Sequence, residues 1–537
     1  MGTETDDGVR VLGIEGTAWA ASAALYGSAT GTVEIETEAY LPESGGIHPR
    51  EAAEHMAEQI PTVVERILDR ARETTDSDPP VDCVAFSRGP GLGPCLRLAG
   101  TSARALAQRL DVPLVGVNHM VAHLEIGRHL SGFDSPVCLN ASGANAHILG
   151  YRDGRYRVLG ETMDTGVGNA IDKFTRHVGW SHPGGPKVEE AAKDGQYVDL
   201  PYVVKGMDFS FSGIMSAAKQ AYDAGTPVED ICCGLQETIF GMLTEVSERA
   251  LALTGSDELV LGGGVGQNDR LQSMLTSMCD QRGASFFAPE DRFLRDNAGM
   301  IAVLGAKMYG AGDTVSIEAS AVDSDFRPDE VPVTWRGSES AVRRTMDELV
   351  QGAESQVRFE DGRVVKRRHE RAYRHPALDE RLRRERTRTE ARLTSQARRA
   401  GVPTPVVRDI DTAESTLTLQ YVGDSDLRDG LTEQRVRAVA RHLATLHRAG
   451  FVHGDPTTRN VRVDGDTVFL IDFGLGYYSD DPEDYAMDLH VLGQSLTGTD
   501  DDADRLREVA IDSYRDVGDG NVVITLREIE GRGRYQS

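Results

Sequence analysis

The stretch "VRVLGIEGTAWAASAALYG", residues 9–27, has the pattern of a strand, a short polar turn and a second strand. A second stretch with the same order, "SPVCLNASGANAHILGYRDG", occupies residues 135–154. Each turn can expose backbone N–H groups to a phosphate, because Gly, Ser, Thr and Asn tolerate tight local geometry. The repeat therefore predicts two related lobes in the first part of the chain.

A third element, "ELVLGGGVGQNDRLQSML" at residues 258–275, reads as an apolar strand, a glycine-rich turn and a helix. Glycines let a backbone approach a phosphate or nucleoside closely, and the N-terminus of a helix favours an anion. Taken alone, the pattern fits a tight turn without a ligand equally well. With the repeat beside it, a nucleotide-binding α/β fold becomes the better interpretation.

The chain length of 537 residues predicts two to four domains, at roughly 100–200 residues each. No stretch reaches the ~18 uninterrupted apolar residues of a membrane span, and "MGTETDDGVR" at the start does not resemble a signal peptide. We therefore expect a cytoplasmic protein with no membrane partner. The six cysteines form no Cys-x-x-Cys pair, which argues against a disulfide framework and a zinc ribbon.

The net charge of −27 would ordinarily argue against a nucleic-acid partner. The acidic residues are spread over the whole length, however, and only seven of the 58 basic residues are lysines. This composition resembles that of proteins from salt-loving archaea. In 1 M salt the Debye length is about 3 Å, so an acidic surface repels little beyond contact. The charge therefore excludes no class of partner.

Two histidines, His119 and His123, lie four residues apart in "VNHMVAHLE" at residues 117–125. On a helix, side chains at this spacing share one face and can reach one small object. A divalent metal is the obvious candidate, and the alternative is one core histidine beside one solvated histidine. A metalloprotease is disfavoured, because Met120 stands where its signature requires Glu.

Nine short motifs follow one another in a fixed order between residues 13 and 302. They are "GIEGTA", "SRGPGLGPCLRLAG", "NHMVAHLE", "SGAN", "GNAIDKF", "HPGGPKVEE", "MDFSFSG", "GGGVGQN" and "RDNAGMIA". This series resembles the universal tRNA threonylcarbamoyltransferase family, the catalytic subunit of the KEOPS complex. The resemblance covers residues 11–335 and implies the two-lobed α/β architecture of actin, Hsp70 and the sugar kinases.

The resemblance implies a metal held by His119, His123 and Asp296 of "RDNAGMIA". Two imidazoles and a carboxylate suit Zn²⁺ or Fe²⁺ and leave coordination positions open for substrate. The family usually has a tyrosine as a further ligand at the position of Asn140. The fourth ligand and the identity of the metal therefore stay open.

The resemblance also implies an adenylate held beside the metal. The positions of the family's nucleotide contacts are Asp172, Gly185, Glu189 and Asn268, with the phosphate near Ser142 to Ala146. The implied substrate-binding residues also include Asn140, Ala141, Ser142, Gly143, Ala144 and Asn145. Taken singly, each Asp, Glu or Asn is as well explained by a helix cap or a turn.

The second part of the chain has the residue order of a kinase site. Lys366 is the only lysine after residue 307, which suggests a role for a compact ammonium, such as binding nucleotide phosphates. Asp455 and Asn460 have D-x4-N spacing in "HGDPTTRN", and Asp472 follows in "LIDFG". Kinases use this order for the catalytic Asp, a metal-binding Asn and a metal-binding Asp.

Residues 343–537 resemble the small atypical kinase of KEOPS, which is related to the RIO kinases. The ATP-binding residues implied are Gly352, Ala353, Glu354, Lys366, Glu390, Asp455, Asn460 and Asp472, with Mg²⁺ at the last two. Only thirteen residues separate Gly474 from Asp488, which leaves no room for an activation loop. This spacing favours ATP hydrolysis or autophosphorylation over phosphorylation of protein substrates.

Residues 366–400 carry 13 basic and 5 acidic residues, a local net charge of +8 in an acidic chain. The stretch predicts a surface that faces tRNA or a partner, or a solvated helix with i,i+4 ion pairs.

We therefore predict a fusion of a transferase, residues 1–335 with lobes at 1–135 and 136–335, a linker at 336–342, and an atypical kinase at 343–537. The reaction implied by the resemblance is transfer of threonylcarbamoyl from threonylcarbamoyl-AMP to N6 of the adenine 3′ of the anticodon in ANN-decoding tRNAs. Expected partners are tRNA, ATP, the synthase of threonylcarbamoyl-AMP and small KEOPS subunits. The alternative is a serine/threonine kinase with a nucleotide-binding regulatory half.

Overall fold

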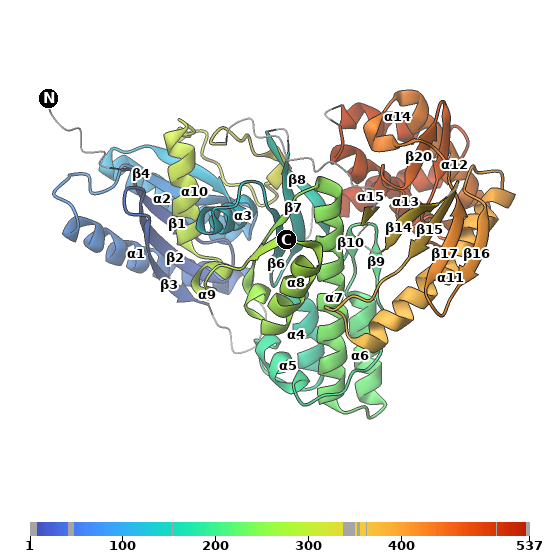
Figure 1. Cartoon of the computed structure of the whole chain (residues 1–537). Coiled ribbons are helices and arrows are strands. Elements are labelled where there is room, and N and C mark those ends of the chain that lie inside the picture. The colour runs from blue at the N-terminus through green and yellow to red at the C-terminus, as the bar shows by residue number, and fades with distance from the viewer. Residues whose placement is uncertain are drawn as a thin grey trace.

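A computed structural model describes residues 8–40, 48–152, 154–336, 350–351, 355–360, 362–500 and 502–532. Figure 1 shows a first part with two sheets and a second part, from residue 350 onward, that packs beside the second sheet. Within the described residues, no helix is long and apolar enough to cross a membrane.

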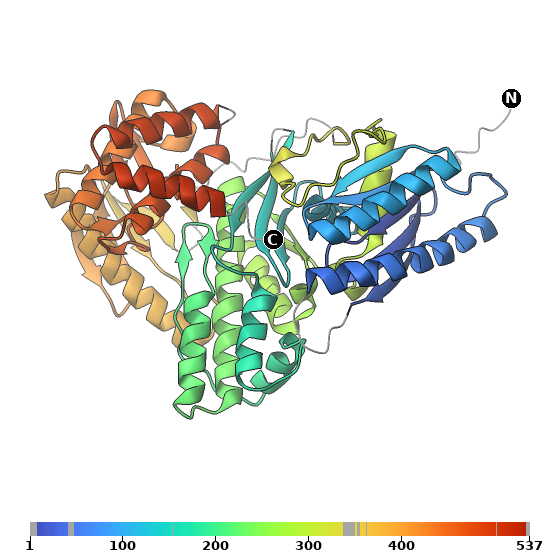
Figure 2. The same ribbon diagram turned by 180° about the vertical axis from the view of Figure 1, so that it is seen from behind.

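The first sheet has the strand order β3-β2-β1-β4-β5. Its strands are β1 (Arg10–Glu15), β2 (Ala20–Gly27), β3 (Thr32–Ala39), β4 (Cys83–Gly89) and β5 (Leu114–Asn118). Strand β1 is antiparallel to β2 and parallel to β4. Alternating residues of β1 point to opposite faces, so both faces of the sheet are apolar and both are covered. Helices α1 (Pro49–Glu73) and α2 (Gly93–Leu110) cover one face (Figure 2).

The second sheet repeats this topology, with the order β8-β7-β6-β11-β12 in corresponding positions. Its strands are β6 (Val137–Ala141), β7 (Ala146–Arg152), β8 (Arg155–Glu161), β11 (Glu258–Gly262) and β12 (Ser285–Phe287). Strand β6 is antiparallel to β7 and parallel to β11, as β1 is to β2 and β4. The two lobes predicted from the repeated strand-turn-strand pattern are therefore confirmed.

Two helices join the lobes. Helix α3 (His119–Ser131) lies between the two sheets, and its first nine residues are all buried. Helix α10 (Ala298–Gly310) comes late in the chain but packs on the first sheet, where a Cβ on Gly13 would clash with the Ala298 carbonyl oxygen at 2.5 Å. The lobe division expected at residue 135 therefore does not apply to α10, because the chain returns to the first sheet after the second is complete.

The remaining elements of the first part lie around the second sheet. They are α4 (Val167–His177), α5 (Gly185–Ala192), β9 (Val204–Lys205), β10 (Asp208–Phe209), α6 (Ser212–Asp223), α7 (Val228–Thr254), η1 (Gly264–Gln267), α8 (Asp269–Arg282), α9 (Asp291–Leu294) and η2 (Pro328–Glu330). The long α7 is buried around most of its circumference, including several charged residues. Such a helix needs partners for its charges as well as for its apolar side chains.

The second part is divided into two lobes. The sheet of the first lobe, in the order β13-β14-β15-β17-β16, contains β13 (Val350–Gln351), β14 (Gln356–Glu360), β15 (Arg363–Arg367), β16 (Val407–Asp411) and β17 (Thr416–Gln420). Helix α11 (Pro376–Arg399) packs against this sheet.

The second lobe is mostly helical and has its own core. Its elements are β18 (Ser425–Asp426), η3 (Leu427–Asp429), α12 (Glu433–Arg448), β19 (Phe451–Val452), β20 (Val461–Asp464), β21 (Thr467–Leu470), β22 (Tyr477–Tyr478), α13 (Pro482–Thr497), α14 (Ala503–Arg515) and α15 (Gly520–Arg532). Of the expected linker 336–342, only residue 336 lies within the described residues.

Candidate active sites

The histidine pair lies on the first turn and a half of α3. Asn118 ends β5 and caps the helix, because its side chain accepts hydrogen bonds from the backbone N–H groups of Met120 (3.0 Å) and Val121 (3.1 Å). His119 and His123 then lie on one face, with ring centroids 4.9 Å apart. Both are buried, so this face of α3 points into the molecule.

Asp296 completes a cluster with the two histidines. It directly precedes Asn297, which caps α10 through a hydrogen bond to the N–H of Met300 (3.2 Å). Asp296 Oδ1 lies 3.3 Å from His119 Nε2 and 3.2 Å from His123 Nε2. One ligand atom from each of the three residues lies within 4.8 Å of the other two, which is close enough for all three to bind one metal ion.

Glu15, which was not predicted as a site residue, holds His119 from the opposite side. It is fully buried at the end of β1, and its Oε2 lies 3.1 Å from His119 Nδ1. If Nδ1 carries the proton and donates to Glu15, the Nε2 lone pair is directed to the side where Asp296 lies. A carboxylate behind a histidine is the usual arrangement around a metal-binding imidazole, so these residues fit a divalent metal.

The charges of the cluster are strongly coupled. Burial lowers the pKa of His119, but the carboxylates of Glu15 and Asp296 outweigh it and raise that pKa to about 10. Burial raises the pKa of Asp296, but the two histidines outweigh it and hold the pKa well below its usual range. Without a metal, the cluster is therefore an ion pair, and a bound metal would take the place of the His119 proton.

Asn140, at the family's tyrosine position, lies beside the cluster at the end of β6. Its amide nitrogen contacts Met120 Sδ at 3.5 Å, while its buried Oδ1 has no hydrogen-bond partner within the described ranges. A Cβ added to Gly262 would lie 3.6 Å from this oxygen and 3.3 Å from His123 Cβ. The structure thus places an unsatisfied amide oxygen close to His123.

The turn after β6 forms a compact loop. Ser142 Oγ accepts a hydrogen bond from the Asn145 N–H (3.1 Å), and the Ser142 N–H donates to the Asn145 carbonyl (2.9 Å). The carbonyl of Gly143 accepts from the N–H of Asn169 in α4. A Cβ on Gly166 would lie 2.3–2.5 Å from backbone atoms of this loop, so only glycine permits this approach of α4.

The other predicted nucleotide contacts accept hydrogen bonds from backbone N–H groups. Asp172 accepts a hydrogen bond from the Gly184 N–H (2.8 Å), next to Gly185 at the start of α5. Glu189 Oε1 accepts from the Asp269 N–H (2.9 Å), and Asn268 caps α8. The structure therefore brings Glu189 and Asn268 together, and both fulfil the cap roles that the sequence left as an alternative. A Cβ on Gly185 would meet nothing within 4 Å, so open space adjoins this loop.

In the second part, Lys366, Glu390 and Asp472 form one cluster. Lys366 Nζ lies 2.9 Å from Glu390 Oε1 and 2.7 Å from Asp472 Oδ1. Asp472 has a φ of +64°, a left-handed conformation that costs a residue with a side chain about 1–2 kcal/mol. Arg368, which was not predicted, lies two residues after Lys366 on the same face and contacts Glu390 Oε2 at 2.6 Å.

Asp455 and Asn460 form the other side of the kinase-like site. Asn460 Nδ2 donates to Asp455 Oδ2 at 2.9 Å. Asp488 holds the preceding backbone, because its two carboxylate oxygens accept hydrogen bonds from the N–H groups of His453 and Gly454, each at 2.8 Å. Gly352, Ala353 and Glu354, the remaining predicted ATP contacts, lie outside the described residues.

The first part of the chain reaches the kinase-like site through α7. Arg249 Nη1 lies 3.4 Å from Asp455 Oδ2 and also donates to the Gly206 carbonyl (3.1 Å), in the turn between β9 and β10. The Gly206 N–H donates to the carbonyl of Gly454, directly before Asp455 (3.0 Å). Asp455 is therefore bounded by residues of the other half, a contact between residues 206 positions apart in sequence that no local pattern indicated.

The basic stretch 366–400 packs against the acidic face of α7. Arg374 Nη2 lies 2.6 Å from Glu245 Oε2, Arg386 Nη2 lies 3.1 Å from Glu245 Oε1, and Arg371 Nη1 lies 3.2 Å from Glu248 Oε1. All five side chains are buried. These three arginines are therefore buried inside the chain and do not form the surface facing tRNA or a partner that was one prediction. The alternative, i,i+4 ion pairs along the helix, is seen for Arg381–Glu385, Arg383–Asp379 and Arg384–Glu380.

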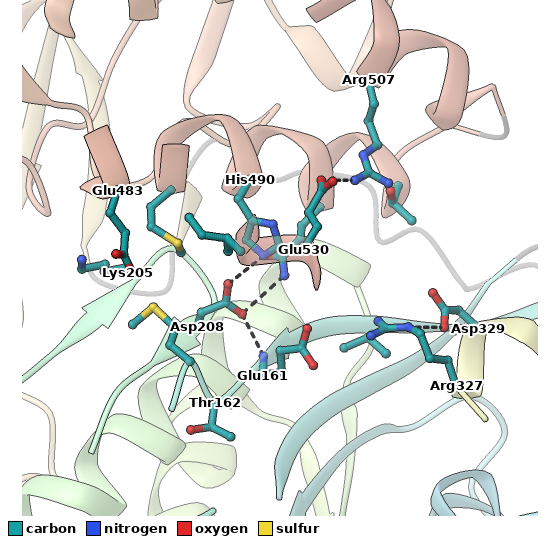
Figure 3. Close-up of a pocket in the computed structure, with 16 residues that line it drawn as sticks. Glu161, Thr162, Lys205, Asp208, Arg327, Asp329, Glu483, His490, Arg507 and Glu530 are labelled. Carbon is teal, nitrogen blue, oxygen red and sulfur yellow. Dashed lines mark hydrogen bonds and ion pairs between the residues drawn. The ribbon is translucent and has the colours of Figure 1, made fainter. Parts of the chain in front are cut away.

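A cavity of about 220 Å³ lies between the two halves, apart from both clusters. Figure 3 shows Asp208 of β10 facing His490 of α13 across it. The Asp208 Oδ2 to His490 Nε2 distance is 3.3 Å, and Asp208 Oδ1 accepts from the Glu161 N–H at 2.8 Å. Burial lowers the pKa of His490, but Asp208 and Glu161 outweigh it and raise that pKa.

Comparison with known proteins relates each half of the chain to a protein family. Residues 30–303 match the family described as TsaD, tRNA N6-adenosine threonylcarbamoyltransferase, and residues 416–519 match the phosphotransferase enzyme family. Three similar proteins are each named probable bifunctional tRNA threonylcarbamoyladenosine biosynthesis protein.

They come from Haloarcula marismortui (69% identical, 98% of this chain and 100% of that one), Halobacterium salinarum (70%, 98% and 99%) and Methanospirillum hungatei (50%, 98% and 99%). The predicted fusion and the resemblance to proteins of salt-loving archaea are thereby confirmed. The chain belongs to the family of bifunctional tRNA threonylcarbamoyladenosine biosynthesis proteins.

Proposed function

We propose that the first half transfers the threonylcarbamoyl group from threonylcarbamoyl-AMP to N6 of the adenine directly 3′ of the anticodon in ANN-decoding tRNAs. The observation that carries the proposal is the buried cluster of His119, His123 and Asp296, with Glu15 behind it. The cluster lies between the two sheets, where α3 meets the segment before α10, beside the glycine-rich loop that begins at Gly262. Clefts between the lobes of α/β proteins are common substrate sites.

The three cluster residues would hold one divalent metal, Fe²⁺ or Zn²⁺, with Asn140 Oδ1 as a candidate further ligand. When bound, the metal supplies a Lewis acid that polarises an oxygen of the substrate. The chain's own contribution is orientation, because the loop at residues 142–145 and the Asn268 loop are fixed by internal hydrogen bonds. A fixed adenylate beside a fixed acceptor converts a bimolecular reaction into an effectively unimolecular one.

The second half, in this proposal, binds Mg²⁺ and ATP through Lys366, Asn460 and Asp472, with Asp455 as the catalytic carboxylate and Glu390 orienting Lys366. It regulates the transferase by ATP hydrolysis or autophosphorylation. The contact between Arg249 and Asp455 supports this role, since it joins the kinase-like site directly to the first half of the chain. A cytoplasmic complex with tRNA, the adenylate synthase and small KEOPS subunits completes the proposal.

The test is transfer of labelled threonylcarbamoyl from threonylcarbamoyl-AMP to an ANN-decoding tRNA at high KCl, with the small subunits added. We expect label in tRNA from the wild type, and none from His119→Ala. His129→Ala is the matched control, because His129 lies on the same helix but packs against Tyr26. Asp455→Ala then reports whether transfer depends on ATP turnover.

Two results would contradict the proposal. If His119→Ala transfers as fast as the wild type, the cluster is not the transferase site. If the wild type transfers nothing but phosphorylates other proteins, a protein kinase with a nucleotide-binding regulatory half becomes the better description.

A further inference from the structure

We propose that Trp19 and Arg295 form the surface on which the acceptor adenine of the tRNA stacks. This inference rests on the proposed transferase activity and identifies where its second substrate binds. Trp19 lies in the turn between β1 and β2, and Arg295 directly precedes Asp296. The Arg295 guanidinium carbon lies 5.7 Å from the centroid of the Trp19 ring.

The turn that carries Trp19 is connected to the cluster of His119, His123 and Asp296. Glu15, which contacts His119, also accepts a hydrogen bond from the Thr17 N–H at 2.7 Å through its other oxygen. The Trp19 carbonyl accepts from the Tyr40 N–H at 2.6 Å. The backbone that carries the indole is therefore fixed at both ends of the turn, with one end at the cluster.

Arg295 connects the cluster to the glycine-rich loop. Its Nε donates to Gln267 Oε1 at 2.9 Å, next to Asn268. A Cβ on Gly264 would lie 3.6 Å from Arg295 Cγ. One exposed arginine thus adjoins Asp296, the loop that begins at Gly262, and Trp19 of the first lobe.

A comparison within the chain shows that this pair is open. Arg336 lies over Tyr151 at 3.6 Å from the ring centroid, and both residues are buried. The Arg295 to Trp19 distance is longer, Trp19 is only half-buried, and Arg295 is exposed. Among the described residues, Trp19 also belongs to neither hydrophobic cluster against the first sheet. The indole is therefore not required for the core and keeps apolar surface available.

The chemistry of the pair fits an unstacked base. Proteins that recognise single-stranded RNA stack its bases on aromatic rings and on arginine planes, and both kinds of surface occur here. The adenylate is the other source of an adenine, but its proposed contacts, Asp172, Glu189 and Asn268, all lie on elements around the second sheet. Trp19 approaches the cluster from the first sheet, which assigns it to the acceptor.

Fluorescence gives a direct test of this contact. The chain has three tryptophans, so a Trp180→Phe, Trp335→Phe double variant of the full chain reports Trp19 alone. We expect an anticodon stem-loop RNA to quench this signal, and the same RNA with an abasic site at the target position to quench it at least about 3-fold less. Equal quenching by both RNAs would overturn the proposal.

Kinetics provide the second test. We expect Trp19→Ala to raise the KM for tRNA about 10-fold or more, as loss of one stacked base usually does, while the KM for the adenylate stays within 2-fold. Trp19→Phe should restore most of the loss. Arg295→Ala should also raise the KM for tRNA. Its matched control is Arg292→Ala, which should not, because Arg292 is exposed on the same segment but lies over Phe293.

The possible failures are separable. If the wild type forms no product, the proposed transferase activity fails. If the wild type is active and Trp19→Ala leaves the KM for tRNA unchanged, only this inference fails. If Trp19→Ala raises the KM for the adenylate instead, the ring belongs to the other substrate and the inference is overturned.

Discussion

Each of the two candidate active sites contains a cluster of four ionisable side chains. Each has two basic side chains and two carboxylates: His119, His123, Glu15 and Asp296 in one, and Lys366, Arg368, Glu390 and Asp472 in the other. The clusters differ in whether their basic side chains can lose a proton at neutral pH. A histidine can lose its proton to solvent and bind a metal through the freed nitrogen, whereas lysine and arginine stay charged and attract phosphate.

The sites also differ in how they are enclosed. The histidine cluster is built wholly by the first half, from β1, α3 and the segment before α10. The lysine cluster is built by the second half, but Asp455 beside it is contacted by Arg249 of the first half. The comparison predicts that variants in the first site affect only transfer, whereas the second site depends on both halves.

The largest effect should come from Asp296→Asn. This change removes the carboxylate that faces both Nε2 atoms, so we expect loss of the bound metal and a decrease in transfer of roughly 1,000-fold. Metal content by mass spectrometry and label transfer measure the two effects. Asp291→Asn, an exposed change on α9, should alter neither. Retention of metal in Asp296→Asn would refute the role of Asp296.

The next largest effect is expected from Lys366→Met. The change leaves buried Glu390 with Arg368 alone and removes the ammonium that would meet phosphate, so ATP turnover should fall roughly 100-fold or more. A phosphate-release assay checks this, with the exposed Lys193→Met as control. If transfer in a single turnover also disappears, the sites are not as independent as the comparison predicts.

Glu245→Gln tests the dependence on both halves. Glu245 is buried and forms ion pairs with Arg249, Arg374 and Arg386. The variant removes its negative charge, so the positive charges of these three arginines are no longer balanced by it. Breaking a buried ion pair typically costs about 3–5 kcal/mol, and we expect a decrease in unfolding free energy of that order. Urea unfolding, followed separately in each half, measures it. An unchanged midpoint would show that the network is not important for stability.

A smaller effect is expected from Glu15→Gln. Without the carboxylate, His119 is oriented less firmly, and removal of a group behind a metal-binding histidine usually costs 10–100-fold in affinity. Competition with a chelator measures the metal affinity. Equal affinities in the variant and the wild type would restrict Glu15 to holding the Thr17 turn.

The smallest effect concerns pH. His490 faces Asp208 and Glu161 of the first half and Glu530 of its own, and these carboxylates raise its pKa in the folded protein. A raised pKa adds stability that is fully present below about pH 6.5 and is lost as pH rises through the folded pKa. We expect a small pH-dependent part of the unfolding free energy in the wild type that is absent from His490→Gln. The measurement is the unfolding free energy of the wild type and of His490→Gln as a function of pH. The same pH dependence in both proteins would contradict the prediction.

Local patterns predicted the parts of the sites that lie close together in sequence. The i,i+4 spacing predicted that the side chains of His119 and His123 lie side by side. The D-x4-N spacing predicted the same for Asp455 and Asn460. The duplicated strand-turn-strand pattern likewise predicted the two sheets, because alternation along a strand is a local property.

Contacts between distant segments could not be read in this way. Glu15 lies 104 residues from His119 and reads as an ordinary strand end. Arg249, Arg371, Arg374 and Arg386 read as surface charges, because their spacing in the sequence does not show that the two halves of the chain will bury them against each other. The position of α10 also depends on a return of the chain to the first sheet, which follows from tertiary packing.

The burial of Arg371, Arg374 and Arg386 has a consequence for experiments that separate the halves. A fragment beginning at residue 343 would expose three arginines and present a basic face that is hidden in the whole chain. Such a face attracts polyanions without regard to sequence, most strongly at low ionic strength. RNA retained by the isolated second half would therefore be an artefact of truncation, whereas RNA retained by the whole chain would report a native surface.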